Sequence, residues 1–68
     1  MRVKSVVFSE NLKRLRRACG LTQKQVAAHL NVTFQAVSKW ETGRAAPDIF
    51  VLPALAELFG CRVDDLLS

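Results

Sequence analysis

The stretch from Thr22 to Glu41, TQKQVAAHLNVTFQAVSKWE, decides the fold because it contains two helix beginnings with a helix end between them. Thr22 and Gln25 form a capping box, in which a hydroxyl accepts a free amide of the first turn and the Gln side chain reaches back to the cap. A helix is therefore predicted to begin near Gln23. Asn31 enters the left-handed conformation at modest cost, so this helix is expected to end there.

A second helix is predicted almost immediately afterwards. Thr33 follows Asn31 after a single intervening residue and is another good N-cap. On the helix at 33–42, Val37 and Trp40 are spaced to face inward, and Gly43 ends the helix. The opposite face carries side chains that are free to meet a partner: Phe34, Gln35, Ser38, Lys39 and Thr42.

The connection between these helices is too short for an antiparallel pair, so they must cross steeply. Ala27 has the small side chain that such a crossing needs where the two backbones approach. The stretch therefore predicts a helix-turn-helix.

The segments TQKQVAAHLNVTFQAVSKWETGRAAP, PALAELFG and VDDLL resemble the Cro/cI-type (XRE-like) helix-turn-helix regulators, over roughly residues 8–67. The resemblance implies an all-α fold, a compact four- to five-helix lambda-repressor-like DNA-binding domain in which helices 2 and 3 form the helix-turn-helix. In that family, an arginine at the position of Arg16 pairs with the glutamate that follows the tryptophan position, here Glu41. The resemblance thus implies a structural ion pair between the first helix and the end of the helix at 33–42.

Composition agrees with a single small helical domain. Half of the 68 residues are hydrophobic, which is enough for one core. The net charge of +4 is unevenly distributed. Residues 11–47 carry seven cations against Glu41 alone, a local +6, whereas residues 48–68 carry four carboxylates against Arg62, a local −3. The basic part coincides with the helix-turn-helix, which is the pattern of a phosphate-binding surface; solvated helix charges are the alternative.

The start of the chain is predicted to be an N-terminal arm or short strand over residues 1–7, with a frayed tail as the alternative, followed by the helix-turn-helix domain at 8–68. Ser9 is expected to cap the first helix, with Phe8 before it as a hydrophobic staple. That helix should end at Gly20 and direct three side chains inward: Leu12, Leu15 and Cys19.

After the helix-turn-helix, Asp48 is expected to cap a further helix that Gly60 ends. Pro53 interrupts its period, so either a turn at 49–52 precedes a helix that Pro53 opens, or one helix is kinked there. The residues expected to face inward are Ile49, Leu52, Leu55, Ala56 and Phe59, followed by Val63, Leu66 and Leu67 in a last turn or two. The two residues expected to point away from the core are Phe50 and Val51.

Several other functions lack the residues they need. Cys19 and Cys61 occupy apolar positions and are interpreted as buried reduced thiols, with a disulfide or a metal site as alternatives. His29 has no neighbouring acid or thiol and should be partly exposed. The chain has no catalytic constellation, because only Asp64 and Asp65 are clustered carboxylates. We therefore expect no enzyme, no cofactor, no metal and no small-molecule ligand, and, without a signal peptide or an apolar span, a cytoplasmic protein.

The parts for binding double-stranded DNA are present. The major groove admits one helix, whose first turn approaches the base edges. Placing the helix at 33–42 there predicts base contacts by Phe34 and Gln35 first, then by Ser38 and Lys39 one turn later. Phe34 offers only its ring, for instance to a thymine methyl, and its alternative is to fold back on the core. The predicted DNA contacts beyond these are Gln23, Lys24 and Arg44 at phosphates, Thr33 at phosphate or as a cap, and Thr42 on the same face.

The sequence thus predicts a sequence-specific transcriptional regulator, a repressor acting as a homodimer. A single helix reads too few base pairs to find one site in a genome, and a two-fold dimer doubles the site. The alternative function is a protein-binding module, such as an antitoxin-like partner whose DNA binding is secondary. Its surface would be formed by Phe50, Val51 and the valines near the N-terminus.

Overall fold

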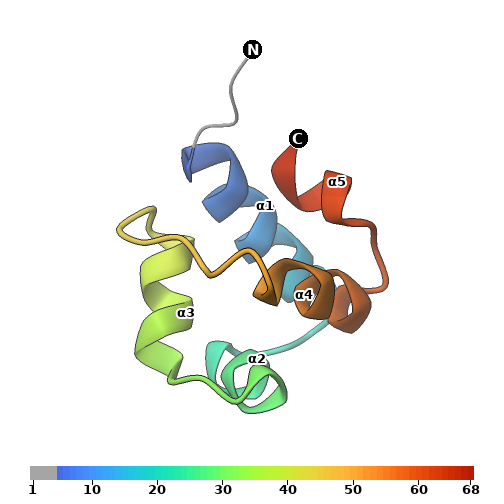
Figure 1. The fold of residues 1–68 in the computed structure, drawn as a ribbon. Helices are drawn as coiled ribbons and strands as arrows, with labels where there is room; N and C mark the ends of the chain where they lie inside the picture. Colours follow the sequence, from blue (N-terminus) through green and yellow to red (C-terminus); the bar gives the residue numbers. More distant parts are fainter. Residues whose placement is uncertain (1–4) are drawn as a thin grey trace.

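The computed structural model describes residues 5–68, which form five helices and, within that range, no strand (Figure 1). The all-α prediction with four to five helices is therefore confirmed. The helices are α1 (Ser5–Ala18), α2 (Gln23–Leu30), α3 (Phe34–Glu41), α4 (Val51–Phe59) and α5 (Val63–Leu67).

The helix-turn-helix has the ends that its caps predict. The Thr22 Oγ1 accepts from the Gln25 amide at 3.0 Å, and the Gln25 Oε1 accepts from the Thr22 amide at 2.8 Å. Asn31 lies in the left-handed region at φ 58°, where the chain leaves α2. The Thr33 Oγ1 accepts from the Ala36 amide at 3.2 Å and so caps α3. Each of these contacts is local, which is why the sequence alone is enough to predict them.

Helix α1 begins earlier than predicted. It starts at Ser5, so the start expected at Ser9 is wrong, and residues 5–7 are helical rather than extended. Ser9 and Phe8 are buried within the helix, and Phe8 lies one turn before Leu12 on the face that meets the core. Burial of that face stabilises the helix at Phe8 and Ser9, so the chain is already helical where a cap was expected. Residues 1–4, the remainder of the predicted arm, lie outside the described residues.

Helix α4 begins two residues before Pro53, which therefore falls in the first turn, where an amide donor has no partner to lose. The prediction that Asp48 caps this helix is wrong, because the N-cap residue is Phe50; the Asp48 Oδ1 instead accepts from the Phe50 amide at 3.0 Å in the turn before the helix. This start shifts the helix phase at its N-terminal end. Ile49 is 70% exposed instead of buried, and Val51 packs against the core instead of pointing away.

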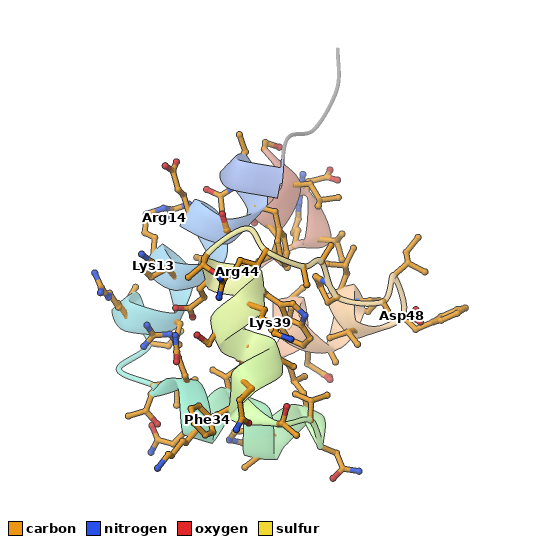
Figure 2. The ribbon with its side chains drawn as sticks, turned by 90° about the vertical axis from the view of Figure 1, so that its left-hand side faces the viewer. Lys13, Arg14, Phe34, Lys39, Arg44 and Asp48 are labelled. Atoms are coloured by element: carbon orange, nitrogen blue, oxygen red, sulfur yellow. The ribbon has the colours of Figure 1, made fainter. Side chains whose placement is uncertain are left out.

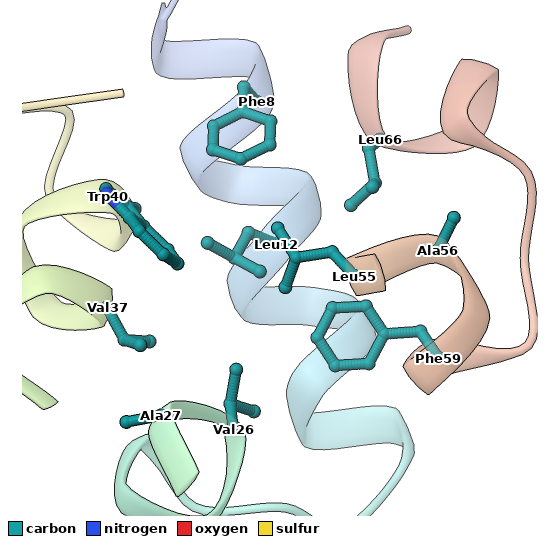
Figure 3. Packing of buried hydrophobic residues seen from close by; sticks show 10 residues of the cluster. All are labelled: Phe8, Leu12, Val26, Ala27, Val37, Trp40, Leu55, Ala56, Phe59 and Leu66. Atoms are coloured by element: carbon teal, nitrogen blue, oxygen red, sulfur yellow. The ribbon is translucent and has the colours of Figure 1, made fainter. Parts of the chain in front are cut away.

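The core draws on every helix (Figure 3). Leu12, Leu55 and Leu66, from α1, α4 and α5, are fully buried, and Val37 and Trp40 cover them from α3. Its remaining members are Phe8, Val26, Ala27, Ala56 and Phe59. Burial of one such large apolar side chain contributes about 1.5 to 3 kcal/mol, so this cluster is what holds α3 in place.

Polar contacts also join distant elements. The Asn11 Nδ2 donates to the Leu66 carbonyl oxygen at 3.0 Å and ties α1 to α5.

Cys19 and Cys61 are free thiols. Cys19 is exposed, so its predicted burial is wrong, and its Sγ lies 3.8 Å from the Phe59 carbonyl oxygen. Within residues 5–68, no helix is both long and apolar enough to cross a bilayer.

Candidate nucleic-acid interface

The outer face of α3 carries the residues that the helical period places there. Gln35, Lys39 and Thr42 are exposed, and Ser38 is half-buried between them. Phe34 keeps 42% of its surface exposed, so its ring does not fold back on the core. In Figure 2, α3 faces the viewer, with Phe34 at one end, Lys39 along its length and Arg44 beyond the other end.

The inner face of α3 is anchored by a buried ion pair. The Nε and Nη2 of Arg16 donate to the two carboxylate oxygens of Glu41, with Nη2 to Oε1 at 3.1 Å. The side chains are only 12% and 2% exposed, respectively. The Arg16 Nη1 also donates to the Leu21 carbonyl oxygen at 2.8 Å, next to the start of α2. The pair implied by the resemblance is confirmed, and it fixes the end of α3 against α1.

Gln23 belongs to this ion-pair network, which the sequence did not indicate. Its Nε2 donates to the Glu41 Oε1 at 3.0 Å and so joins the first residue of α2 to α3. The amide group predicted to meet a phosphate is thus already engaged by a carboxylate. The free backbone amides at the start of α2 are the groups left to meet an anion there, and the phosphate contact of the Gln23 side chain stays a prediction.

The two threonines at the ends of α3 serve the backbone. Thr33 acts as the cap, one of its two predicted roles. The Thr42 Oγ1 lies 3.1 Å from the Ser38 carbonyl oxygen and 3.2 Å from that of Lys39, to which it donates. Thr42 therefore closes the last turn of α3, and its hydroxyl keeps its lone pairs as acceptors.

Lys24 and Phe34 form a contact across the turn. The Lys24 Nζ lies 5.4 Å from the centroid of the Phe34 ring, within the range of a cation–π interaction. This pair joins the first turn of α2 to the first residue of α3. No pattern in the sequence could have revealed it, because the contact depends on how the two helices cross.

Cations lie to one side of α3 and beyond its C-terminal end. Figure 2 shows Lys13 and Arg14 of α1 to one side of α3, and the Arg14 Nη2 donates to the Asn11 Oδ1 at 3.2 Å. Arg44 is held close to the helix end, because its backbone amide donates to the Lys39 carbonyl oxygen at 3.0 Å. The sequence-based set of contacts left out Lys13 and Arg14, although both belong to the basic segment at 11–47. The outer face of α3 is thus an exposed, polar ridge in a positive surrounding.

A shallow groove of about 260 Å³ lies elsewhere, between α2 and α4. Its walls are His29, Leu30, Ala54, Glu57 and Leu58. None of the predicted DNA contacts lines it, and His29 is exposed there as predicted.

Comparison with known proteins decides the family. A family model described as helix-turn-helix matches residues 12–66. The chain belongs to the XRE-like helix-turn-helix family. The match covers most of the chain and includes both helices of the predicted motif.

Two relatives of this chain are named as transcription regulators. The chain is 41% identical over 61 residues to the HTH-type transcriptional activator BcrR of Enterococcus faecalis, covering 90% of this chain and 30% of that protein. It is 38% identical over 62 residues to the SPbeta prophage-derived uncharacterized HTH-type transcriptional regulator YonR of Bacillus subtilis, covering 91% and 57%. The chain thus spans less than two thirds of either relative.

Solved structures show the same helical arrangement in other settings. The hydroxypropylphosphonic acid epoxidase from S. wedmorenis superposes with a TM-score of 0.88 at 25% identity, covering all of this chain and 36% of the epoxidase. The clp gene regulator ClgR from Corynebacterium glutamicum superposes with a TM-score of 0.86 at 24% identity, covering 93% and 67%. The helix-turn-helix fold therefore occurs in both an enzyme chain and a regulator, and function has to be argued from the surface of α3.

Proposed function

We propose that this helix-turn-helix chain binds double-stranded DNA in a sequence-specific manner and regulates transcription, with α3 in the major groove. The observation that carries the proposal is the outer face of α3, where polar and basic side chains are exposed and flanked by cations. The inner face of the same helix is fixed by Trp40 and by the Arg16–Glu41 pair. A rigid helix with an exposed polar ridge is the element that groove recognition needs.

In this docking each exposed side chain has a role that its chemistry permits. Gln35 can bond in a bidentate manner to adenine, and Lys39 can donate to the guanine acceptors O6 and N7. Ser38 lies between them and can donate to either purine. The flanking groups contact the backbone, where charge matters more than base identity: Lys24, Arg44 and the amide end of α2 with Gln23.

We also propose that the working species is a symmetric homodimer on a pseudo-palindromic site. No principal dimension of the protomer exceeds 33 Å, which is less than the distance of about 34 Å that separates successive major grooves on one side of DNA. Two protomers side by side therefore fit half-sites about 10 base pairs apart. The proposed mode is repression in the cytoplasm, since occupancy of a promoter is enough to block it, although the relative BcrR is named an activator.

Selection of random duplexes by the purified protein tests this function. We expect enrichment of a two-fold symmetric motif with half-site centres about 10 base pairs apart. Sedimentation of the complex should then give two protomers per site. The matched control is the Gln35→Ala and Lys39→Ala double variant, which should fold normally and lose the motif. Failure to enrich any motif would argue against the proposal, and one protomer on an asymmetric motif would exclude the dimer.

A second candidate function is a protein-binding module, such as an antitoxin-like partner. It is favoured by two exposed apolar side chains before α4, Ile49 at 70% and Phe50 at 85%. Val51 no longer supports it, because that side chain packs against the core. Stoichiometric capture of a protein from the native host, lost in a Phe50→Ser variant, would support this candidate over autonomous DNA binding.

A further inference from the structure

The contact between Lys24 and Phe34 places an apolar ring at the point where a recognition helix meets its ligand. Phe34 is the first residue of α3, and Lys24 lies in the first turn of α2. The Lys24 ammonium is 5.4 Å from the ring centroid, and 42% of the Phe34 surface remains exposed. The ring therefore has a cation over one face and keeps part of its surface open to solvent.

The backbone on both sides of the turn is fixed, which limits where the ring can move. The capping box of Thr22 and Gln25 sets the first turn that carries Lys24. The hydrogen bond from the Ala36 amide to Thr33 sets the start of α3. Between them, the Val32 amide donates to the Ala27 carbonyl oxygen at 3.0 Å across the turn. Only side-chain torsions remain free, and the cation–π contact restricts those of Phe34.

We infer that Lys24 is a positioning residue for base recognition, which holds the Phe34 ring against the 5-methyl group of a pyrimidine in the major groove. The inference rests on the proposed docking of α3. A phenyl ring has no donor or acceptor, and the apolar group that unmodified bases present in the major groove is the thymine methyl. A 5-methylcytosine carries the same group, so either base can supply it.

This role differs measurably from that of a simple phosphate contact. A lysine that binds only phosphate weakens binding about uniformly across sequences when it is removed. A lysine that positions Phe34 also changes the preference for the methyl group. Its ammonium can contact a phosphate and the ring together, because three N–H groups diverge from one charge.

The experiment uses a duplex selected by the protein, in which each thymine is replaced in turn by deoxyuridine to remove the methyl group alone. For the wild type, we expect one position per half-site where this weakens binding about four-fold, the value for burying one methyl-sized group. In Phe34→Ala and Phe34→Gln this ratio should fall to about one. Lys24→Met keeps the length of the side chain and removes its charge. In this variant the ratio of the affinities for the thymine and deoxyuridine duplexes should fall to about two, as expected for the loss of a weak cation–π contact.

Lys13→Met is the matched control, because it removes one cation that lies to one side of α3 without touching Phe34. It should weaken both duplexes equally and leave the four-fold ratio unchanged. Thermal melting of each variant confirms that it is folded, and Phe34→Gln serves if Phe34→Ala does not fold. Where a selected site has cytosine at the position, 5-methylcytosine should strengthen binding by the same factor.

Two results would overturn the inference and leave DNA binding in place. One is that neither the deoxyuridine nor the 5-methylcytosine duplexes give a ratio that depends on Phe34. The other is that Lys24→Met weakens the thymine and deoxyuridine duplexes by the same factor. A wild-type protein that binds no duplex selectively would instead contradict the proposed function itself.

Discussion

The helix-turn-helix at 22–42 and the helix pair at 48–67 share one core but are stabilised by different means. The first region has side-chain caps at both helix starts and a buried ion pair. In the second region, α4 begins at Val51 after an N-cap residue, Phe50, that provides no side-chain cap, and the ion pair between Arg62 and Asp64 is about 80% exposed. The region proposed to meet DNA is thus held by a buried ion pair, whereas the polar contacts of the other region are exposed or partly buried hydrogen bonds that supplement apolar packing.

Two aromatic residues, one in each region, should give the largest contrast. Trp40 is 6% exposed under the helix-turn-helix, so Trp40→Ala should cost about 3 to 5 kcal/mol through the cavity it leaves. A domain of this size has roughly 3 to 10 kcal/mol in total, so the variant should be largely unfolded. Phe50 is 85% exposed, so Phe50→Ala should change stability by less than about 0.5 kcal/mol. Thermal and urea unfolding measure both, and equal losses would contradict the assignment of the core.

The two ion pairs should differ almost as strongly. Arg16→Met removes the cationic partner of the buried Glu41 carboxylate and leaves it the neutral Gln23 amide, so the loss should be roughly 3 kcal/mol or more. Arg62→Met removes an exposed partner of Asp64 and should cost less than about 1 kcal/mol. Urea unfolding at low and high salt tests this comparison. The expected difference would be refuted if both substitutions were neutral, because Glu41 would then have no need of its partner.

The same contrast explains how much of the fold could be predicted from sequence. Thr22, Asn31 and Thr33 act on backbone groups a few residues away, so the bounds of α2 and α3 could be predicted correctly. The start of α1 was not predicted correctly, because Ser9 looks like an N-cap in the sequence, whereas in the fold it is buried beside Phe8 within the helix. Ile49 was predicted to face inward and Val51 to point away from the core, whereas in the structure Ile49 is exposed and Val51 packs against the core. The turn at Asp48 and the position of Pro53 together set the phase of the helix, and sequence alone did not indicate their combined effect.

For the candidate site, sequence was enough to predict which face of α3 is exposed but not the contacts between helices. The exposed positions follow from helical period alone, and they hold for Gln35 and Lys39. The hydrogen bond of Gln23 to Glu41 and the Lys24–Phe34 contact depend on the crossing of α2 and α3. Side chains from separate helices meet only once that crossing is known.

The charge difference between the regions predicts a strong effect of salt on binding. Neutralising about four to six phosphates per protomer should give a slope of log K against log salt of about −4 to −5. Affinity per protomer should thus fall roughly 250- to 1,000-fold between 50 and 200 mM salt. Asp64→Asn and Asp65→Asn in the acidic region should leave this slope unchanged. Measuring the DNA affinity across that range of salt concentration gives the slope, and a slope near zero would exclude the proposed docking.

The smallest effects expected are those of single base contacts. Gln35→Ala and Lys39→Ala should each reduce discrimination at particular base pairs by about 1 to 3 kcal/mol. Both side chains are exposed, so the melting curve should stay within about 0.5 kcal/mol of the wild type. Binding to duplexes with single base changes gives the discrimination, with Glu57→Gln in the second region as a control that should keep the same preference. If Gln35→Ala weakened binding to every duplex equally, Gln35 would be a phosphate contact, and α3 would lie in the groove with a different face toward the bases.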